Sequence, residues 1–421
     1  IGKLIGLAVF SSDALSSVAY GPQELMMMLA AAGLVSLQYS LPLVLCIVGL
    51  LAILTISYEQ TIHAYPNGGG SYIVSRDNLG VLPAQIAGAA LLTDYILTVA
   101  VSISSSVAQI SSAFPGLFRW RVEIAIVFIM LIMVINLRGV KESGVTFAIP
   151  TYFFIVMMYI TIVVGLVRYF AGTLGIVANP PELTILAEPQ ALGLFLLLKA
   201  FASGTASVTG VEAISDGITA FREPRSKNAG TTLIFMALIL GSMLIGVTFL
   251  AGQVSAIPSE HETLVSQISR TVFDGRGFLY LLTIIGTTVI LVMAANTAFA
   301  DFPRLGAITA NDGFLPRQLT YRGSRLVYSR GIMALAILAS VLIILFKANV
   351  SGLIPLYAIG VFLSFTLSQS GMAHRWWKSG RLEPGQEKVE QGSVVKYEKN
   401  WMIKMIINGF GAVVTFFVTI I

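Results

Sequence analysis

Residues 6–21 read GLAVFSSDALSSVAYG and set one carboxylate, Asp13, among serines and small residues in an otherwise apolar stretch. The apolar run around it covers residues 3–32 and is long enough to span a membrane as a helix. Ionised groups at the depth of a bilayer are costly and usually mark the path of an ion or a substrate. We therefore expect an interrupted membrane helix with an ion site at Asp13.

The composition of the whole chain agrees with a membrane setting. Of its 421 residues, 56% are hydrophobic and only 11% are charged, and the mean hydropathy is +0.84. A soluble chain of this size would lack the polar surface to cover itself, so we predict a polytopic membrane protein. The single cysteine, Cys46, allows no disulfide within the chain and leaves the redox compartment open. The chain begins at Ile1 with no signal-peptide pattern, and we expect residues to be missing at both ends.

Apolar runs long enough to span a bilayer recur along the chain, and the pattern predicts eleven of them. They lie at residues 3–32, 37–62, 82–112, 121–137, 146–171, 191–220, 230–253, 278–308, 331–347, 351–372 and 401–421. Between two of them, residues 258–273 carry the apolar period of an amphipathic helix, which predicts either a helix along the membrane face or an ordinary loop helix.

The Lys and Arg residues are distributed unevenly over the predicted loops. With the first end in the cytoplasm, nineteen of the 26 fall on the cytoplasmic side, Lys141, Arg322 and Arg325 among them; six fall outside and Lys199 lies within a helix. This bias predicts a multi-pass protein of the cell membrane with a cytoplasmic N-terminus. Anionic membrane lipid is then the expected partner of the basic residues, and nucleic acid is not needed.

Two predicted helices, five apart in order, are interrupted in a similar way. The first is broken at residues 11–17, SSDALSS, and the sixth at residues 203–210, SGTASVTG. Paired interruptions in corresponding helices are typical of inverted-repeat transporters whose site lies at the membrane midplane, where unwound backbone exposes carbonyls and half-helix ends. The alternative is that the small residues only permit close helix packing.

Oxygen-bearing side chains gather near both interruptions. Asp94, Thr98 and Ser102 fall at i, i+4 and i+8, so they share one face of the third helix. The others are Tyr20, Thr209, Glu212, Asp216 and Tyr357. Hard cations prefer such oxygen ligands, whereas zinc or copper would require nitrogen or sulfur. A cage of hydroxyl and carbonyl oxygens with modest charge suits potassium, although each hydroxyl alone could be a helix–helix hydrogen bond.

Several motifs carry a family resemblance. The chain contains YPNGGGSY (65–72), NLRGVKESG (136–144), TGVEAISDGITAFREP (209–224) and NTAFADFPRLGAITANDGFLPRQ (296–318), and through them it resembles the APC superfamily with a LeuT-type fold. Within that superfamily, SSDALSSVAYG (11–21), DYILTVAVSIS (94–104), TGVEAIS (209–215) and LIPLYAIGVF (353–362) resemble the KUP-type potassium transporters.

The resemblance implies an all-α polytopic membrane protein, with a 5+5 inverted repeat, broken helices 1 and 6, and an eleventh helix. The repeats would cover residues 1–172 and 191–372, followed by a cytoplasmic linker at 373–400 and the last helix at 401–421. The implied activity is potassium import by symport with protons, without a cofactor. The potassium-binding positions of the family fall on Asp13, Tyr20, Thr98, Ser102, Thr209, Glu212 and Tyr357. KUP-type proteins also have a twelfth helix and a cytosolic C-terminal domain, so a homodimer is expected if the full-length chain carries that domain.

An amino-acid or polyamine permease of the same fold, coupled to protons, is the main alternative. Amino-acid carriers generally use a glycine-rich break whose bare N–H groups receive the substrate carboxylate. Here no glycine lies between Gly6 and Gly21, and Asp13 would repel a carboxylate but attract a cation. Sodium coupling through Asn296 and Thr297 is a further alternative.

Glu212 and Asp13 are the candidates for proton coupling, because a carboxylate can exchange its proton when a cation arrives beside it. We interpret Glu59, Lys199 and Asp301 as residues of helix ends or gates rather than ligands.

Enzymatic readings find no support. The GGGS at residues 68–71 lacks the ending of a phosphate loop, and His63, His261 and His374 lie in separate loops without ligand spacing. The serine clusters have no histidine partner, so the pattern of a hydrolase triad is absent from the sequence.

Overall fold

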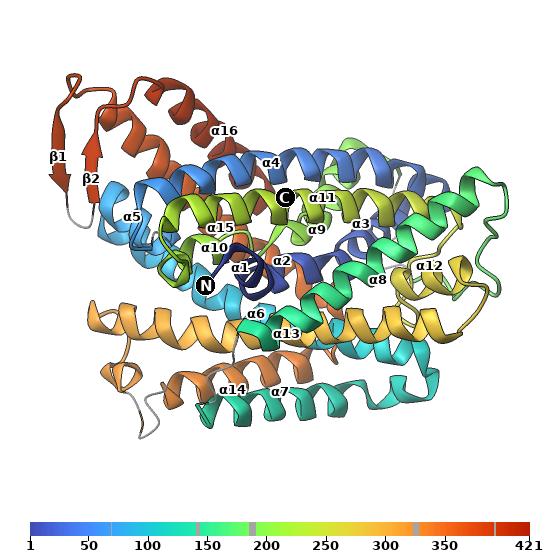
Figure 1. Cartoon of the computed structure of the whole chain (residues 1–421). Helices are drawn as coiled ribbons and strands as arrows, with labels where there is room; N and C mark the ends of the chain where they lie inside the picture. The colour runs from blue at the N-terminus through green and yellow to red at the C-terminus, as the bar shows by residue number, and fades with distance from the viewer. Residues whose placement is uncertain (69, 140–143, 185–190, 322, 324–327, 391–392) are drawn as a thin grey trace.

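The computed structural model is a bundle of long helices that run along a common direction, with a two-stranded hairpin at one end (Figure 1). It describes residues 1–68, 70–139, 144–184, 191–321, 323, 328–390 and 393–421, and the charges predicted for the cytoplasmic side at Lys141, Arg322 and Arg325 lie outside that part. We call the end that carries β1 and β2 the hairpin end and the opposite end, where α12 lies, the α12 end.

The helices follow one another along the chain in two halves. The first half contains α1 (Lys3–Phe10), α2 (Ser12–Ser16), η1 (Ser17–Ala19), α3 (Gly21–Leu29), α4 (Ser40–Ala64), α5 (Ser71–Leu79), α6 (Val81–Ala113), η4 (Pro115–Trp120), α7 (Arg121–Leu137) and α8 (Gly144–Phe170). The second contains α9 (Leu194–Gly204), η5 (Thr205–Val208), α10 (Ala213–Asp216), α11 (Arg225–Gln253), α12 (Leu264–Val272), α13 (Phe278–Asn311), α14 (Ser329–Leu345), α15 (Val350–Ser379), β1 (Glu387–Glu390), β2 (Ser393–Lys396) and α16 (Trp401–Ile420).

These helices match the predicted spans. In the described part of the chain, nine helices are long and apolar enough to cross a membrane, and the bent pair Lys3–Phe10 and Ser12–Ala32 brings the number to 10. The helix Ser329–Leu345 is apolar but shorter. Each of the eleven predicted runs overlaps one of these elements, so the all-helical membrane class is confirmed.

The way apolar side chains are exposed also fits a lipid solvent. On α7, Val127 is 59% exposed and Leu131 57% exposed, and on α16 Phe417 is 58% exposed. Such faces would be unfavourable in water but are satisfied by hydrocarbon. The helix α6, in contrast, is largely buried and packs against α13, α15 and α5, so it forms the centre of the bundle. On α4, the only cysteine, Cys46, is exposed.

The two interruptions meet inside the bundle. The first run bends by 56° between α1 and the helix that starts at Ser12. The hydroxyl of Ser17 donates to the backbone oxygen of Ser207 at 2.6 Å, across 190 residues of chain. Gly21 packs so closely against η5 that an added Cβ would stand 2.3 Å from Ser207 Cβ. The two breaks therefore pack tightly against each other, and we call this contact, around Ser17, Gly21 and Ser207, the seam.

The predicted helix within residues 258–273 is present as α12 (Leu264–Val272), and it is packed inside the protein. Most of its side chains are buried, polar Ser266, Gln267 and Ser269 among them. Gln267 donates to the backbone oxygens of Ile257 and Glu262, so the polar face is satisfied internally. An ordinary, buried loop helix is the interpretation that the structure favours.

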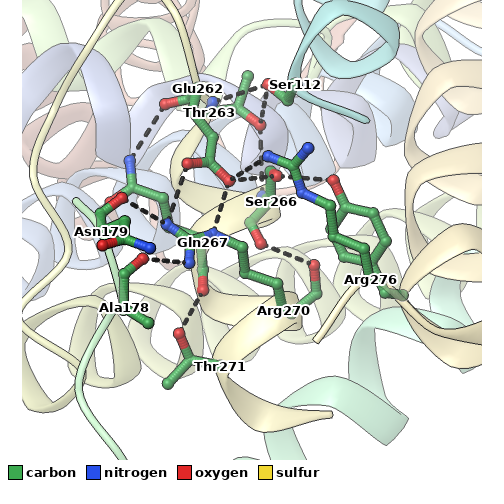
Figure 2. A network of polar contacts seen from close by, with 12 residues as sticks. Ser112, Ala178, Asn179, Glu262, Thr263, Ser266, Gln267, Arg270, Thr271 and Arg276 are labelled. Carbon is green, nitrogen blue, oxygen red and sulfur yellow. Dashed lines mark hydrogen bonds and ion pairs between the residues drawn. The ribbon is translucent and has the colours of Figure 1, made fainter. Parts of the chain in front are cut away.

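A charged network holds α12 and the neighbouring loops together (Figure 2). Glu262 accepts from Arg270 Nε at 2.8 Å and from Ser266 Oγ at 2.9 Å. Arg270 also donates to the backbone oxygen of Ala178 at 2.6 Å, which ties the loop after α8 to α12. Paired, hydrogen-bonded charges thus join α12 to the loops around it.

At the other end, the segment expected as a linker, residues 373–400, contains regular structure. The helix α15 continues to Ser379, and β1 pairs with β2 in an antiparallel hairpin whose register joins Glu387 with Lys396. Arg375 of α15 donates to Ser393 Oγ at 2.7 Å. The hairpin is therefore attached to the end of α15.

The packing of the seam gives a stability test. Gly21→Ala should lower the apparent melting temperature of the purified protein by several degrees, because overpacking a tight core costs about 1–3 kcal/mol. The matched control is Gly49→Ala on α4, where an added Cβ meets nothing within 4 Å. Equal melting temperatures for the two variants would contradict a tight seam.

Candidate functional site

The candidate site lies where the two interruptions meet. The segment between η5 and α10 leaves the helical path at Thr209, whose backbone is extended, and at Gly210, whose φ is +78°. A Cβ on Gly210 would stand 2.7 Å from Ala14 N and 2.8 Å from Asp13 Oδ2. Glycine is therefore required here both for the left-handed backbone and for the close approach of Asp13.

Four predicted hydroxyl groups meet at this segment, one of them from Thr209 itself. Tyr357 of α15 donates to Thr209 Oγ1 at 2.8 Å, and Thr98 of α6 donates to the Tyr357 hydroxyl at 3.3 Å. The Tyr20 phenol, at the junction of η1 and α3, interacts with both Thr209 and Tyr357. All four side chains are at most 3% exposed. We call Tyr20, Thr98, Thr209 and Tyr357 the hydroxyl cluster.

Two carboxylates adjoin the hydroxyl cluster. Asp13, on α2, interacts electrostatically with Tyr20 and Tyr357, and so does Asp94 of α6. In the described part of the chain, Asp13 Oδ1 and Asp94 Oδ1 are buried without a hydrogen-bond partner. Buried oxygens of this kind are costly unless something binds them, and a cation is the ligand that suits them.

Ser102 is placed on the same helix as Thr98, one turn further along, and is 1% exposed. Asp94, Thr98 and Ser102 lie on one helix at the predicted spacing; Thr98 and Ser102 are buried, and Asp94 is half-buried. Thr98, the middle residue of these three, is the one that belongs to the hydroxyl cluster.

Glu212 has a separate set of partners. Its Oε1 accepts from the backbone N–H and the hydroxyl of Ser71, both at 2.6 Å. Its Oε2 accepts from the Tyr58 hydroxyl at 3.1 Å and from Ser364 Oγ at 3.3 Å. These donors surround the Glu212 carboxylate, so it is not open in the way that Asp13 and Asp94 are. Glu212 also lies close enough to Asp94 to interact with it electrostatically.

Tyr58, Ser71 and Ser364 were not predicted from the sequence. Ser71 is the first residue of α5, directly after the glycines of residues 68–70, and the first N–H groups of a helix have no partner within the helix. A serine that follows a run of glycines at the start of a helix could therefore have predicted that the backbone N–H of Ser71 seeks an acceptor. Tyr58 and Ser364 lie in long apolar helices and show no local pattern.

A cavity of about 180 Å³ lies at the hairpin end of the site. It is lined by Tyr72, Asp216, Asp301 and Arg304, among others. Asp216 approaches the backbone so closely that a Cβ on Gly70 would stand 2.3 Å from its Oδ1. Asp301, predicted as a gate residue, thus lines a polar cavity next to a basic partner, Arg304.

The remaining predicted residues lie elsewhere. Lys199 of α9 stacks on the Phe195 ring with Nζ 4.6 Å from its centroid, and Glu59 Oε1 of α4 lies 3.2 Å from His63 Nδ1. For the sodium alternative, Asn136 donates to Asn296 Oδ1 at 2.7 Å.

Thr297 completes that alternative pair, and its hydroxyl donates to the Ala294 backbone oxygen at 2.6 Å. Both Asn296 and Thr297 line a cavity of about 260 Å³ together with Phe10 and Asp301.

Comparison with known proteins places the chain among membrane carriers. A family described as amino acid permease matches residues 2–421. The chain is 46% identical over 417 residues to the potassium transporter KimA of Bacillus subtilis (strain 168), and the match covers 99% of this chain but 65% of that relative's length.

More distant relatives match shorter parts. The low affinity potassium transport system protein Kup of Pectobacterium atrosepticum is 28% identical over 165 residues, covering 38% of this chain and 25% of the relative. The cationic amino acid transporter 6, chloroplastic, of Arabidopsis thaliana is 28% identical over 149 residues, covering 32% of this chain and 26% of the relative. The resemblance to KUP-type transporters, and to KimA among them, is confirmed.

The hydroxyl cluster can be tested without an assay of function. In a double-mutant cycle, Tyr357→Phe and Thr209→Val should show a coupling of about 1 kcal/mol in the free energy of unfolding, because they share a buried hydrogen bond. Tyr169→Phe, on a tyrosine that is 38% exposed, is the control and should add independently to Thr209→Val. Additive losses for Tyr357→Phe and Thr209→Val would show that the bond does not form.

Proposed function

This chain belongs to the amino acid permease family, and we propose that within this family it works as a secondary active importer of potassium ions. The observation that carries the proposal is the set of oxygen atoms around Asp13, with two buried carboxylate oxygens, Asp13 Oδ1 and Asp94 Oδ1, that lack a partner in the described chain. The name of the relative KimA, potassium transporter, supports the same substrate. Because the chain spans 65% of that relative's length, the activity of the whole protein is part of the proposal.

The proposed potassium ligands come from five segments of the chain. Asp13 supplies the charge, and the neutral oxygens come from the hydroxyl cluster and from Ser102. Glu212 completes the proposed set of Asp13, Tyr20, Thr98, Ser102, Thr209, Glu212 and Tyr357. Such a cage replaces the water shell of potassium with protein oxygens at a low cost in net charge.

Glu212 is the proposed proton carrier, with Asp13 as the second candidate. Its four donors come from Tyr58, Ser71 and Ser364, so its charged form is held by hydrogen bonds from α4, α5 and α15. Protonation would remove the charge that strengthens those bonds. A proton and a potassium ion could then cross together, which makes the carrier a symporter.

The proposed architecture is the LeuT-type arrangement, with repeats at residues 1–172 and 191–372, a linker at 373–400 and an added helix at 401–421. It is supported by the paired interruptions at α1/α2 and at η5/α10 and by their contact. The proposed orientation puts the hairpin end in the cytoplasm, because Arg225, Arg304 and Arg375 lie near that end. Transport would then alternate between cavities at the two ends. A homodimer is part of the proposal only for a longer chain with a C-terminal domain.

A permease for amino acids or polyamines is the second candidate, favoured by the family description. The environment of Asp13 argues against a zwitterion, because the substrate's carboxylate would meet Asp13 and Asp94 rather than free N–H groups.

The first transport test uses cells that lack their own potassium import, grown at low potassium. Asp13→Asn should lose at least about tenfold in rubidium uptake, because removing one partner of a buried charge pair costs about 2 kcal/mol or more. The control is Glu383→Gln, an exposed carboxylate after α15, which should support growth like the parent chain. Uptake of labelled amino acids, without rescue by the parent chain at low potassium, would favour the second candidate instead.

The second transport test concerns the proton. In proteoliposomes with an inward proton gradient, Glu212→Gln should lose gradient-driven rubidium uptake, because an amide takes up no proton. Glu383→Gln again provides the control for surface charge, and uptake should be followed over a series of outside pH values. Uptake by Glu212→Gln that still rises with the gradient as in the parent chain would remove Glu212 from the coupling mechanism.

A further inference from the structure

A second polar cavity lies on the other side of the hydroxyl cluster, at the α12 end, with a volume of about 40 Å³. It is bounded by α3, α6, the start of α7, the loop before α12 and the start of α15. We call it the Glu24 cavity, after the carboxylate in its interior. A water molecule needs roughly 10–15 Å³ of such space, so the cavity admits a few occupants of water size and excludes an amino acid.

Glu24 is buried within α3 and is 2% exposed. Its backbone N–H donates to the Tyr20 oxygen at 2.9 Å, so it lies one helical turn beyond a member of the hydroxyl cluster. Ser351 of α15 donates to Glu24 Oε1 at 3.0 Å. Within the part of the chain that the structure describes, no Lys or Arg forms an ion pair with Glu24. A buried carboxylate without a basic partner either takes up a proton or is compensated by a bound cation.

The rim of the cavity contains a second carboxylate, which is already compensated. Glu260 accepts from Asn349 Nδ2 at 2.8 Å, and its Oε2 lies 3.7 Å from Arg121 NH1. The side chains of Glu260 and Arg121 are 26% and 22% exposed, so they face the solvent at the mouth. Glu260 and Arg121 form an ion pair, whereas Glu24, when ionised, has no basic partner among the described residues. Glu260 also repels Glu24 electrostatically, and a cation between them would relieve this.

Two hydroxyls complete the donor set from the opposite wall. Ser104 and Ser111 fall at i and i+7 on α6, with Ala108 between them, so they share one face, and both line the cavity. They are 1% and 2% exposed, respectively. The Oγ atoms of both have no hydrogen-bond partner among the described residues. Unpaired buried hydroxyls are costly, and their oxygens can ligate a cation.

We propose that the Glu24 cavity is a second cation site, in which Glu24, Ser104 and Ser111 hold a partly hydrated monovalent alkali cation. A single carboxylate without a basic partner suits a monovalent ion, whereas divalent calcium generally requires several carboxylates. The assignment of this ion as transported cargo rests on the proposed function. In the proposed orientation the site faces the outside, and the ion would wait there, one turn of α3 from Tyr20, before it reaches Asp13.

The direct test uses thallium(I), which replaces potassium and scatters X-rays anomalously. Crystals of the purified protein soaked in thallium should show one anomalous peak at Asp13 and a second at Glu24. Glu24→Gln should lose the second peak and keep the first. Peaks at Asp13 alone in the parent chain would overturn the outer site but leave the proposed function standing, whereas a peak at Glu24 alone would support the outer site and count against the central one. Absence of both peaks would overturn both.

Serine variants provide a matched control on one helix. Ser104→Ala and Ser111→Ala should each reduce the thallium peak at Glu24, because each removes one oxygen ligand. Ser105→Ala should leave the peak unchanged. Ser105 is also buried, at 2% exposed, with an unpartnered hydroxyl, but it does not line the cavity. An equal effect of all three variants would indicate a general disturbance of α6 and overturn the assignment.

A kinetic measurement separates a waiting site from the central one. In proteoliposomes, Glu24→Gln should raise the rubidium concentration for half-maximal uptake roughly tenfold at low ionic strength and leave the maximal rate within about twofold, because a fixed charge at the entrance concentrates cations. The difference should shrink as inert salt is added. An unchanged half-maximal concentration would contradict a role for Glu24 in cation entry.

Discussion

The central constraint in this structure is the close contact between two interrupted helices. Ser17 donates to the Ser207 backbone, and Gly210 leaves no room for a side chain against Asp13. Because Gly21 and Gly210 leave no room for a larger side chain, the extended backbone at Thr209 stays next to α2. The helices α6 and α15 then add their hydroxyls from the sides, through Thr98 and Tyr357. This approach of backbone to backbone thus holds Thr209 at the place where those hydroxyls reach it.

The buried carboxylates are treated in two different ways. Glu212 receives four hydrogen bonds and is fully surrounded by donors. Asp13 and Asp94 each keep one buried oxygen without a partner in the described chain. In a low-dielectric interior, satisfied groups give rigidity, whereas unsatisfied ones give affinity for whatever can pair with them. A division between a held carboxylate and open ones is the arrangement expected where one group exchanges a proton and others bind an ion.

The sequence predicted those parts of the molecule that depend on residues close together in the chain. Long apolar runs gave the helices, and small polar residues at 11–17 and 203–210 gave the interruptions. The stripe of Asp94, Thr98 and Ser102 followed from helical spacing. Tyr357 was among the oxygen-bearing residues named from the sequence, but no spacing could show its contacts with Thr98 and Thr209, because these partners are far away in the chain.

Long-range pairing explains what sequence reasoning missed. The donors Tyr58 and Ser364 reach Glu212 across 154 and 152 residues of sequence, and no periodicity records such contacts. The burial of α12 was missed because an amphipathic pattern shows that a face is polar but not what covers it. Here Gln267 and Ser266 find partners inside the protein.

The exposed thiol of Cys46 has a practical consequence. It is the only sulfhydryl in 421 residues, and it is exposed on α4. A nitroxide or a fluorophore would therefore attach at one known place in the unmodified chain. A second label, introduced at a chosen helix on the far side of the bundle, would turn the molecule into a spectroscopic ruler. Distances between the two probes, taken with and without alkali salts, would report how far one part of the bundle swings against the other.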